Sequence, residues 1–163
     1  MKARSRAASR STGLAIVEFA FVGLLSFIIL FGGIEFARLM YTWNALTEGT
    51  RKGARVAAVC PLNHSAIANV TIYRTPAGAS LGVGFPGLET TNVQVQYLTD
   101  AGATTTVRAN VAYVRVSIVN YQLRLFIPVI EPTITMPAFT TTLPAESLGI
   151  VPGGTPQCFG TAS

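Results

Sequence analysis

The sequence is poor in charged residues and in the side chains that enzymes commonly use for chemistry. Only 12% of its 163 residues are charged, against roughly 25% in an average soluble domain. There is one histidine, His64, with no second histidine or cysteine at metal-ligand spacing, and the seven carboxylates are scattered. No nucleophile elbow or phosphate-binding glycine loop is present. We therefore expect no enzyme, metal or cofactor, and interpret His64 as a surface or capping residue.

The net charge of +5 does not indicate a nucleic-acid-binding surface, because its source lies at one end of the chain. Four of the twelve basic residues precede residue 14, where there is no acid: Lys2, Arg4, Arg6 and Arg10. The other eight basic groups face seven acidic ones, so residues 14–163 carry a net charge of only +1. We expect no binding to DNA or RNA through a basic face.

Cysteine is also scarce, and the two cysteines are far apart in the sequence, at Cys60 and Cys158. Their spacing does not fit a CxxC redox motif or a zinc site. An even number at this separation favours one disulfide in an oxidising compartment, with two unrelated buried thiols as the alternative. The disulfide would attach a Gly/Pro-rich tail, loose from Gly149 onward, to the region before Pro61.

The apolar residues, 50% of the chain, are concentrated in a run of twenty-one residues from Leu14 to Ile34. Its single charge is Glu18. As a helix this run rises about 30 Å, which is enough to cross the hydrocarbon core of a bilayer. Because basic residues precede the run, the positive-inside rule predicts a cytoplasmic N-terminus and a non-cytoplasmic location for residues 35–163.

Three interpretations of this run compete. A cleaved secretory signal has an apolar stretch of roughly 7–15 residues followed by a small-residue cleavage site, whereas this run is longer and ends in Gly32, Gly33 and Ile34. A plain membrane anchor leaves Glu18 unexplained, because a carboxylate inside a bilayer costs about 3 kcal/mol. A prepilin-type N-terminus gives the acid a role.

In the prepilin interpretation, residues 1–13 are a cytoplasmic leader and the bond between Gly13 and Leu14 is cut. Leu14 then becomes the first residue of the mature chain, and Glu18 becomes the fifth. The new α-amino group of one subunit can neutralise the Glu18 carboxylate of a neighbour, so that cleavage permits helices to pack. A basic leader, a glycine, an apolar helix and a glutamate at this position together are the signature of type IV prepilins and pseudopilins.

Residues 13–58 resemble the TadE-like family, the minor pilins or pseudopilins of tight-adherence (Tad, or Flp) pilus systems. Three blocks carry the resemblance: G-x-A-x-V-E-F at Gly13–Phe19, G-x-x-E-F-x-R at Gly32–Arg38, and a small, basic run at Ala45–Arg55. The resemblance leaves open whether the chain is TadE, TadF or another member. It implies a part in building a type IV pilus that supports surface attachment and biofilm formation.

The resemblance also implies the partners and the location of the protein. The partners are a prepilin peptidase, other major and minor pilins, and an inner-membrane assembly platform. The location is the inner membrane, crossed once, with a periplasmic C-terminal domain that becomes extracellular in an assembled pilus. The alternative is a bitopic inner-membrane anchor that displays a periplasmic binding domain and never enters a filament.

Helical spacing continues beyond the apolar run and predicts a stem helix over residues 35–60, ended by Pro61. Glu48 and Lys52 are spaced as an i,i+4 ion pair. An apolar stripe is expected on the stem at Phe36, Leu39, Met40 and Trp43. A repeat of small residues every four positions should let another backbone approach closely; it consists of Gly49, Gly53 and Ala57.

Residues 61–163 should form a small β-rich domain after a short helix at 65–70. Alternation over residues 93–97, a turn at 100–102 and renewed alternation over 107–118 predict an antiparallel hairpin, with Ala112, Val114, Val116 and Ile118 on one face. Further strands at 133–136 and 139–143 should be short and at a sheet edge because prolines flank them. The expected fold is α+β and pilin-like: a long N-terminal transmembrane and stem helix packed on a small antiparallel sheet.

Overall fold

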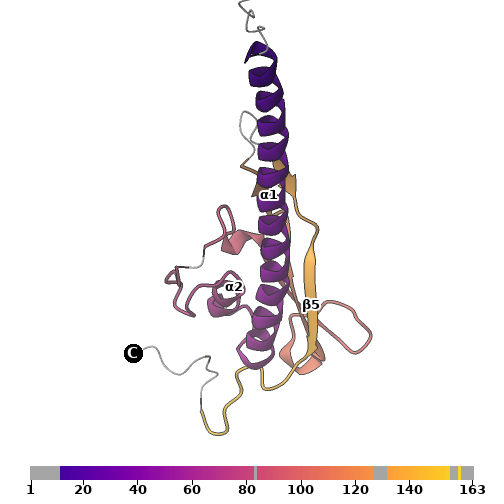
Figure 1. Cartoon of the computed structure of the whole chain (residues 1–163). Helices are drawn as coiled ribbons and strands as arrows, with labels where there is room; N and C mark the ends of the chain where they lie inside the picture. The colour runs from indigo at the N-terminus through magenta and orange to yellow at the C-terminus, as the bar shows by residue number, and fades with distance from the viewer. Residues whose placement is uncertain (1–11, 83, 127–131, 155–157, 159–163) are drawn as a thin grey trace, which may run out of the picture. The chain divides into compact units, whose positions relative to one another are not determined.

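The longest element of the protein is helix α1, which runs from Thr12 to Val59 (Figure 1). A computed structural model describes residues 12–82, 84–126, 132–154 and 158. Residues 1–11 of the expected leader lie outside the described residues. The chain divides into two units, with the boundary after Arg38. The uninterrupted helix confirms the prediction for residues 14–59, in which no proline occurs before Pro61.

The C-terminal end of α1 is completed by a segment distant in sequence. The carbonyl oxygen of Ala58 accepts hydrogen bonds from the N–H groups of Glu146 (3.1 Å) and Leu148 (3.2 Å), and that of Val59 accepts one from Gly149 (2.6 Å). Gly149 has φ +79°, and a Cβ there would lie 2.6 Å from the ring of Pro61, so glycine is required. The predicted tail is thus attached to the helix end at its first residue.

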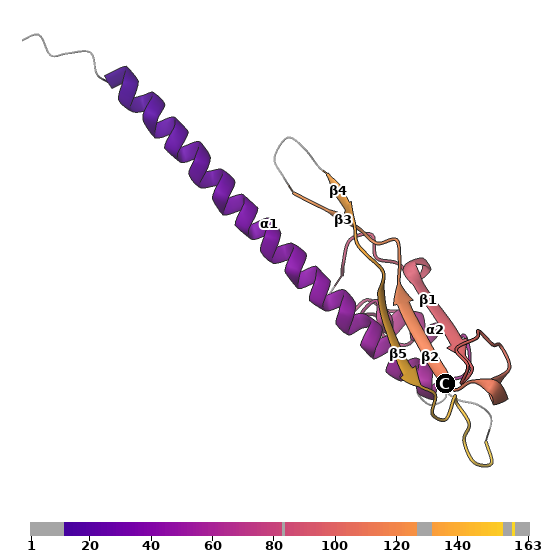
Figure 2. The same cartoon turned by 90° about the vertical axis from the view of Figure 1, so that its right-hand side faces the viewer.

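The domain contains an antiparallel sheet in the order β1-β2-β5, formed by β1 (Val93–Leu98), β2 (Tyr113–Ile118) and β5 (Phe139–Pro144) (Figure 2). Val93 pairs with Ile118, which in turn pairs with Phe139. Alternate residues of β2 face the core: Val114, Val116 and Ile118 are fully buried. The predicted antiparallel pairing is confirmed, and so is the buried face except at Ala112, which precedes β2 and is half-buried. Strand β5 lies at the edge of this sheet among the described residues.

The second strand of the hairpin begins at Tyr113, six residues later than predicted. Residues 107–112 are not a strand, and a 3-10 turn occupies Arg108–Asn110. The expected turn is present, with the N–H of Gly102 donating to the carbonyl of Thr99 (2.9 Å). The chain then folds back along β1, where the N–H of Thr105 donates to the carbonyl of Tyr97 (2.8 Å). This contact delays the β1–β2 pairing until Tyr113.

A second pairing joins β3 (Gln122–Arg124) to β4 (Thr133–Thr135) in an antiparallel ribbon. The sequence indicated β4 but not β3, which has three residues and no alternation long enough to recognise. Helix α2 spans Ser65–Thr71, as the sequence predicted to within one residue. His64 caps it through Nδ1, which accepts a hydrogen bond from the N–H of Ala66 (3.2 Å).

The helix face that packs on the sheet consists of small and medium-sized residues. Ala54 and Ala57 share a core cluster with Val114 and Val116, and the Thr50 hydroxyl lies 2.9 Å from that of Thr141 on β5. The buried positions of α1 are Thr42, Leu46, Gly49, Thr50, Gly53, Ala54, Ala57 and Ala58.

The stripe of large apolar residues on the stem does not mark the face of α1 that the domain covers. Phe36 is 64% exposed, Trp43 41% and Met40 38%, whereas Leu39 packs against the core. The small side chains of the other face allow the helix axis to approach the sheet more closely than these large ones would. Periodicity therefore located an apolar stripe but not the face that the domain covers.

The predicted Glu48–Lys52 ion pair is also wrong. Glu48 lies 3.8 Å from Arg51 instead, and Lys52 Nζ lies 4.7 Å from the centre of the Tyr73 ring. The Tyr73 hydroxyl donates to the carbonyl of Ala45 (2.7 Å), which holds the ring beside α1. A lysine over an aromatic face is stabilised by the ring quadrupole, and this contact replaces the ion pair.

Candidate functional site

The first candidate site is the apolar part of α1, from Leu14 to Ile34. Its large side chains are exposed, with Leu14 at 77% and Phe19 at 78%. Within the described residues, α1 is the one helix long and apolar enough to cross a membrane, and none of its most apolar window is buried. Such a helix fits a single-pass membrane protein, because this surface would otherwise be exposed to water.

The residues expected at the cleavage site, Gly13 and Leu14, and the acid of the apolar run, Glu18, all lie near the exposed start of this helix. Gly13 and Leu14 belong to the first turns of α1, and a Cβ on Gly13 would touch nothing within 4 Å. Glu18 is exposed, and the ion pairs found in the described part of the chain do not include it. Its carboxylate is available to accept charge-assisted hydrogen bonds from an ammonium group.

The two charges that follow the apolar run neutralise each other. Arg38 Nη2 lies 2.9 Å from Glu35 Oε2, and Arg38 Nε also donates to this oxygen (3.3 Å). The side chain of Glu35 is 14% exposed. The i,i+3 spacing within the G-x-x-E-F-x-R block lets this pair form within one turn of α1.

The small residues Gly49 and Gly53 face the end of α2 within the same chain. A Cβ on Gly49 would lie 2.5 Å from the carbonyl oxygen of Thr71, and one on Gly53 would overlap the Thr71 hydroxyl. Thr71 is fully buried, and its hydroxyl donates to the carbonyl of Ile67 (2.7 Å). Ala57, the third member of the repeat, is buried against the sheet. The close approach is intramolecular, which the sequence could not specify.

Replacing Gly53 with valine should lower the free energy of unfolding of the domain by about 3 kcal/mol, because a branched side chain cannot fit beside Thr71. Urea unfolding of the full chain in detergent micelles, followed by circular dichroism, measures this loss. A double-mutant cycle of Gly53→Ala with Thr71→Ala provides the control: the coupling should be at least about 1 kcal/mol. Strictly additive effects would contradict the contact.

The two cysteines, Cys60 and Cys158, are joined by a disulfide, with their Cα atoms 4.8 Å apart. Cys60 is 1% exposed and follows the last residue of α1. The disulfide thus reinforces the hydrogen bonds that residues 146–149 make to the same helix end. Its role in the described structure is a cross-link.

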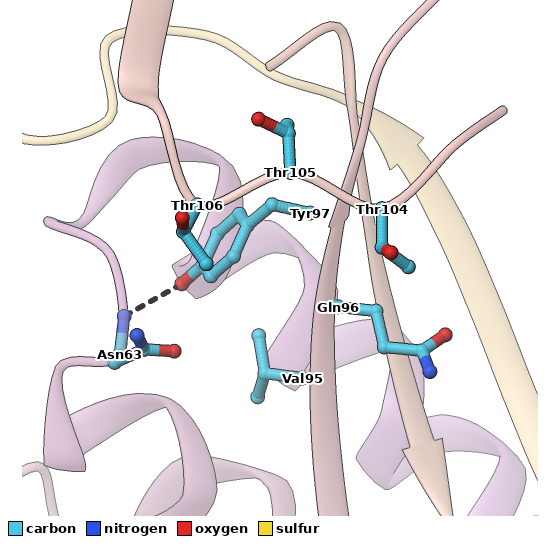
Figure 3. A pocket seen from close by; sticks show the side chains of 7 residues that line it. All are labelled: Asn63, Val95, Gln96, Tyr97, Thr104, Thr105 and Thr106. Atoms are coloured by element: carbon cyan, nitrogen blue, oxygen red, sulfur yellow. Dashed lines mark hydrogen bonds between the residues drawn. The ribbon is translucent and has the colours of Figure 1, made fainter. Parts of the chain in front are cut away.

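An open pocket of about 290 Å³ lies beside β1 (Figure 3). Its lining residues are Asn63, Val95, Gln96, Tyr97, Thr104, Thr105 and Thr106. The Tyr97 hydroxyl accepts a hydrogen bond from the N–H of Asn63 (2.8 Å). Burial raises the pKa of the Tyr97 phenol, and the hydrogen bond from Asn63 opposes this shift. The pocket lining contains no acid–base pair.

Metal-binding chemistry receives no support from the described residues. They contain no group of three or more His, Cys, Asp or Glu side chains arranged to hold a metal ion. The features that stand out in the described residues are an exposed apolar helix with one acid, a close contact between α1 and α2, and a disulfide.

Comparison with known families identifies the helix rather than the domain. Residues 13–55 match the family model described as TadE-like protein. This match confirms the resemblance found in the sequence blocks and covers the apolar run, the Glu35–Arg38 pair and the glycines that face Thr71. No curated protein and no solved structure matches the chain.

Proposed function

We propose, from the TadE-like pattern in residues 13–55, that the protein is a minor pilin or pseudopilin that takes part in assembly of a tight-adherence pilus. The observation that carries the proposal is the exposed apolar part of α1 that follows Gly13, with Glu18 five residues after that glycine. This arrangement gives the protein one surface for lipid and for the helices of other pilins. The pilus would support surface attachment and biofilm formation.

Processing supplies the charge that the helix needs for assembly. A prepilin peptidase hydrolyses the Gly13–Leu14 peptide bond and frees the α-amino group of Leu14. With an ordinary pKa of about 7.7–8.0, this group is largely protonated at neutral pH. It can then pair with the Glu18 carboxylate of an adjacent subunit, and the pairing offsets the cost of holding each charge in apolar surroundings. Before cleavage, the amide nitrogen carries no such charge.

The topology follows from the same elements. Basic residues before Leu14 favour a cytoplasmic N-terminus, and a disulfide between Cys60 and Cys158 fits the oxidising periplasm. The domain then faces the periplasm while the protein is in the inner membrane, and the outside when it is in a pilus. Other major and minor pilins and the inner-membrane assembly platform are the expected partners.

The mass of the N-terminus tests this proposal directly. Protein recovered from bacteria that carry the matching peptidase should begin at Leu14 and should also be present in sheared surface fibres. Gly13→Val should retain residues 1–13 and be absent from the fibres, because a branched side chain blocks the cleavage site. Gly23→Val is the matched control, since it adds the same side chain to α1 where nothing lies within 4 Å. Full-length wild-type protein confined to the membrane would instead indicate a bitopic anchor.

A further inference from the structure

Exposed apolar side chains continue beyond the membrane-spanning run, at the end of the domain where α1 enters it. Tyr41 is 60% exposed, Trp43 41% and Met40 38%. Ile134 on the β3–β4 ribbon is 39% exposed. We call these four residues the apolar rim. Small residues, by contrast, make up most of the α1 face that the sheet covers.

Contacts within the domain connect Trp43 to the β3–β4 ribbon, and Met40 and Tyr41 lie within one helical turn of Trp43 on α1. The Trp43 ring packs edge-on against Phe139, with ring centres 5.0 Å apart. Phe139 shares a core cluster with Leu123, the strand partner of Ile134, and Leu39 packs against the same cluster. Figure 2 shows the β3–β4 ribbon extending from the end of the sheet opposite the β1–β2 connection.

The chemistry of the apolar rim fits the headgroup layer of a bilayer. Tryptophan and tyrosine concentrate at membrane–water interfaces, because their rings are apolar and their N–H or O–H groups reach water. The rim continues directly from an apolar helix that fits a membrane span. A two-stranded ribbon of three-residue strands is also only marginally stable in water. Further burial of Ile134, which lies on the same face as buried Leu123, would stabilise it.

The distance between Glu18 and Tyr41 along α1 allows both side chains to lie in headgroup layers at the same time. Tyr41 lies 23 positions after Glu18 in the sequence, which is about 35 Å along a helix. The hydrocarbon core is about 30 Å thick, so Tyr41 and Glu18 can occupy opposite headgroup layers. If residues 14–34 filled the core instead, Glu18 would lie about 6 Å inside it and Tyr41 about 10 Å beyond it.

This placement puts the charged residues Glu35 and Arg38 in the outer part of the hydrocarbon core, which is unfavourable for isolated charges. Because the two side chains are 2.9 Å apart, they enter as a neutral pair rather than as separate charges. Glu18, which has no ion-pair partner among the described residues, avoids the hydrocarbon.

We propose that, before it joins a fibre, the domain rests on the lipid bilayer with its apolar rim in the outer headgroup layer and Phe19–Leu39 in the hydrocarbon. The Gly13–Leu14 bond then lies on the cytoplasmic side of Glu18, where water and a hydrolase can reach it. The inference rests on the proposed function only in requiring that α1 crosses a membrane. It adds a lipid-binding surface on the domain itself.

Trp43 is the single tryptophan of the chain, so its fluorescence reports on the apolar rim directly. The full chain is reconstituted in phosphatidylcholine vesicles that carry quenchers in the headgroup, just below it, or near the acyl-chain methyl end. Quenching of Trp43 should be about twofold stronger with the shallow labels than with the deep one. Iodide in the water should quench it weakly. The control Trp43→Phe/Tyr113→Trp moves the fluorophore to a side chain with the same 41% exposure. It should respond to iodide and to none of the lipid labels.

A second variant separates failure of this inference from failure of the proposed function. In Trp43→Phe/Phe27→Trp the fluorophore lies within the apolar run, where the deep label should quench it most. If that holds while Trp43 responds to iodide and not to shallow labels, the helix crosses the membrane but the domain stands clear of it. If both fluorophores ignore the lipid labels, the membrane span itself is wrong. Protection of Trp43 from iodide and lipid labels alike would indicate a protein covering and would overturn the inference.

Discussion

Replacing Glu18 with leucine should leave the protein in the membrane but lower its amount in sheared fibres by at least about tenfold. Removing one partner of a buried ion pair leaves the other charge uncompensated, at a cost of about 3–5 kcal/mol. In the proposed fibre the uncompensated group is the Leu14 ammonium of the adjacent subunit. Quantitative immunoblotting of membrane and sheared fractions, with the N-terminal mass measured in parallel, gives the result.

Two further variants identify the charge as the cause. Glu18→Gln retains shape and hydrogen-bonding capacity but not the charge, so it should assemble as poorly as the leucine variant. Ser26→Leu makes a similar polar-to-apolar change in the same exposed helix, where the Ser26 hydroxyl bonds only to the carbonyl of Val22 (2.8 Å) in the described structure. It should assemble normally. Normal fibres from both Glu18 variants would contradict the proposed pairing.

Removing the disulfide with Cys60→Ala/Cys158→Ala should lower the free energy of unfolding of the domain by about 4 kcal/mol. The bridge spans a sequence separation of 98 residues, and the chain-entropy model assigns about 4–5 kcal/mol to a loop of that size. Urea unfolding of the full chain in micelles, monitored by Trp43 fluorescence, measures the change. Reductant should shift the wild-type midpoint to that of the double variant and leave the variant unchanged.

Ser147→Ala is the matched control at the same helix end. The Ser147 hydroxyl donates to the carbonyl of Val59 (3.2 Å) and is exposed, so its loss should cost about 1 kcal/mol or less. Equal unfolding midpoints for the wild type and the double cysteine variant would show that the backbone hydrogen bonds of Glu146, Leu148 and Gly149 suffice without the bridge.

Elements that depend on local signals were predictable from the sequence. Helix α1 has no proline before Pro61, and apolar and polar residues alternate in β2 and over Val93–Tyr97 of β1. Strand β5 is a threonine-rich segment that lies between prolines. The 3-10 turn at Arg108–Asn110 and strand β3 were not predictable, because both depend on where the chain returns in space. The segment at Thr105 bonds to Tyr97, and that pairing is a tertiary event.

The candidate site likewise contains residues that the sequence predicted and contacts that only the structure showed. Gly13, Leu14, Glu18 and the TadE-like blocks are sequence patterns, and the family match rests on them. The partner of Gly49 and Gly53 was not visible, because a small-residue repeat indicates close approach without indicating to what. The structure assigns it to Thr71 of the same chain.

By itself, the sequence determined that the protein has a long apolar helix with one acid near its start, followed by a small β-rich domain with two distant cysteines. Those properties depend on composition and periodicity along the chain. Only the tertiary structure decided which face of α1 packs on the sheet. Removing an apolar side chain from water is favourable whether protein or lipid covers it, so apolarity alone does not identify the face that the sheet covers. It buried Leu46 and Ala54 and left Tyr41 and Trp43 exposed, because the small-residue face is the one that lets the helix lie close to the strands.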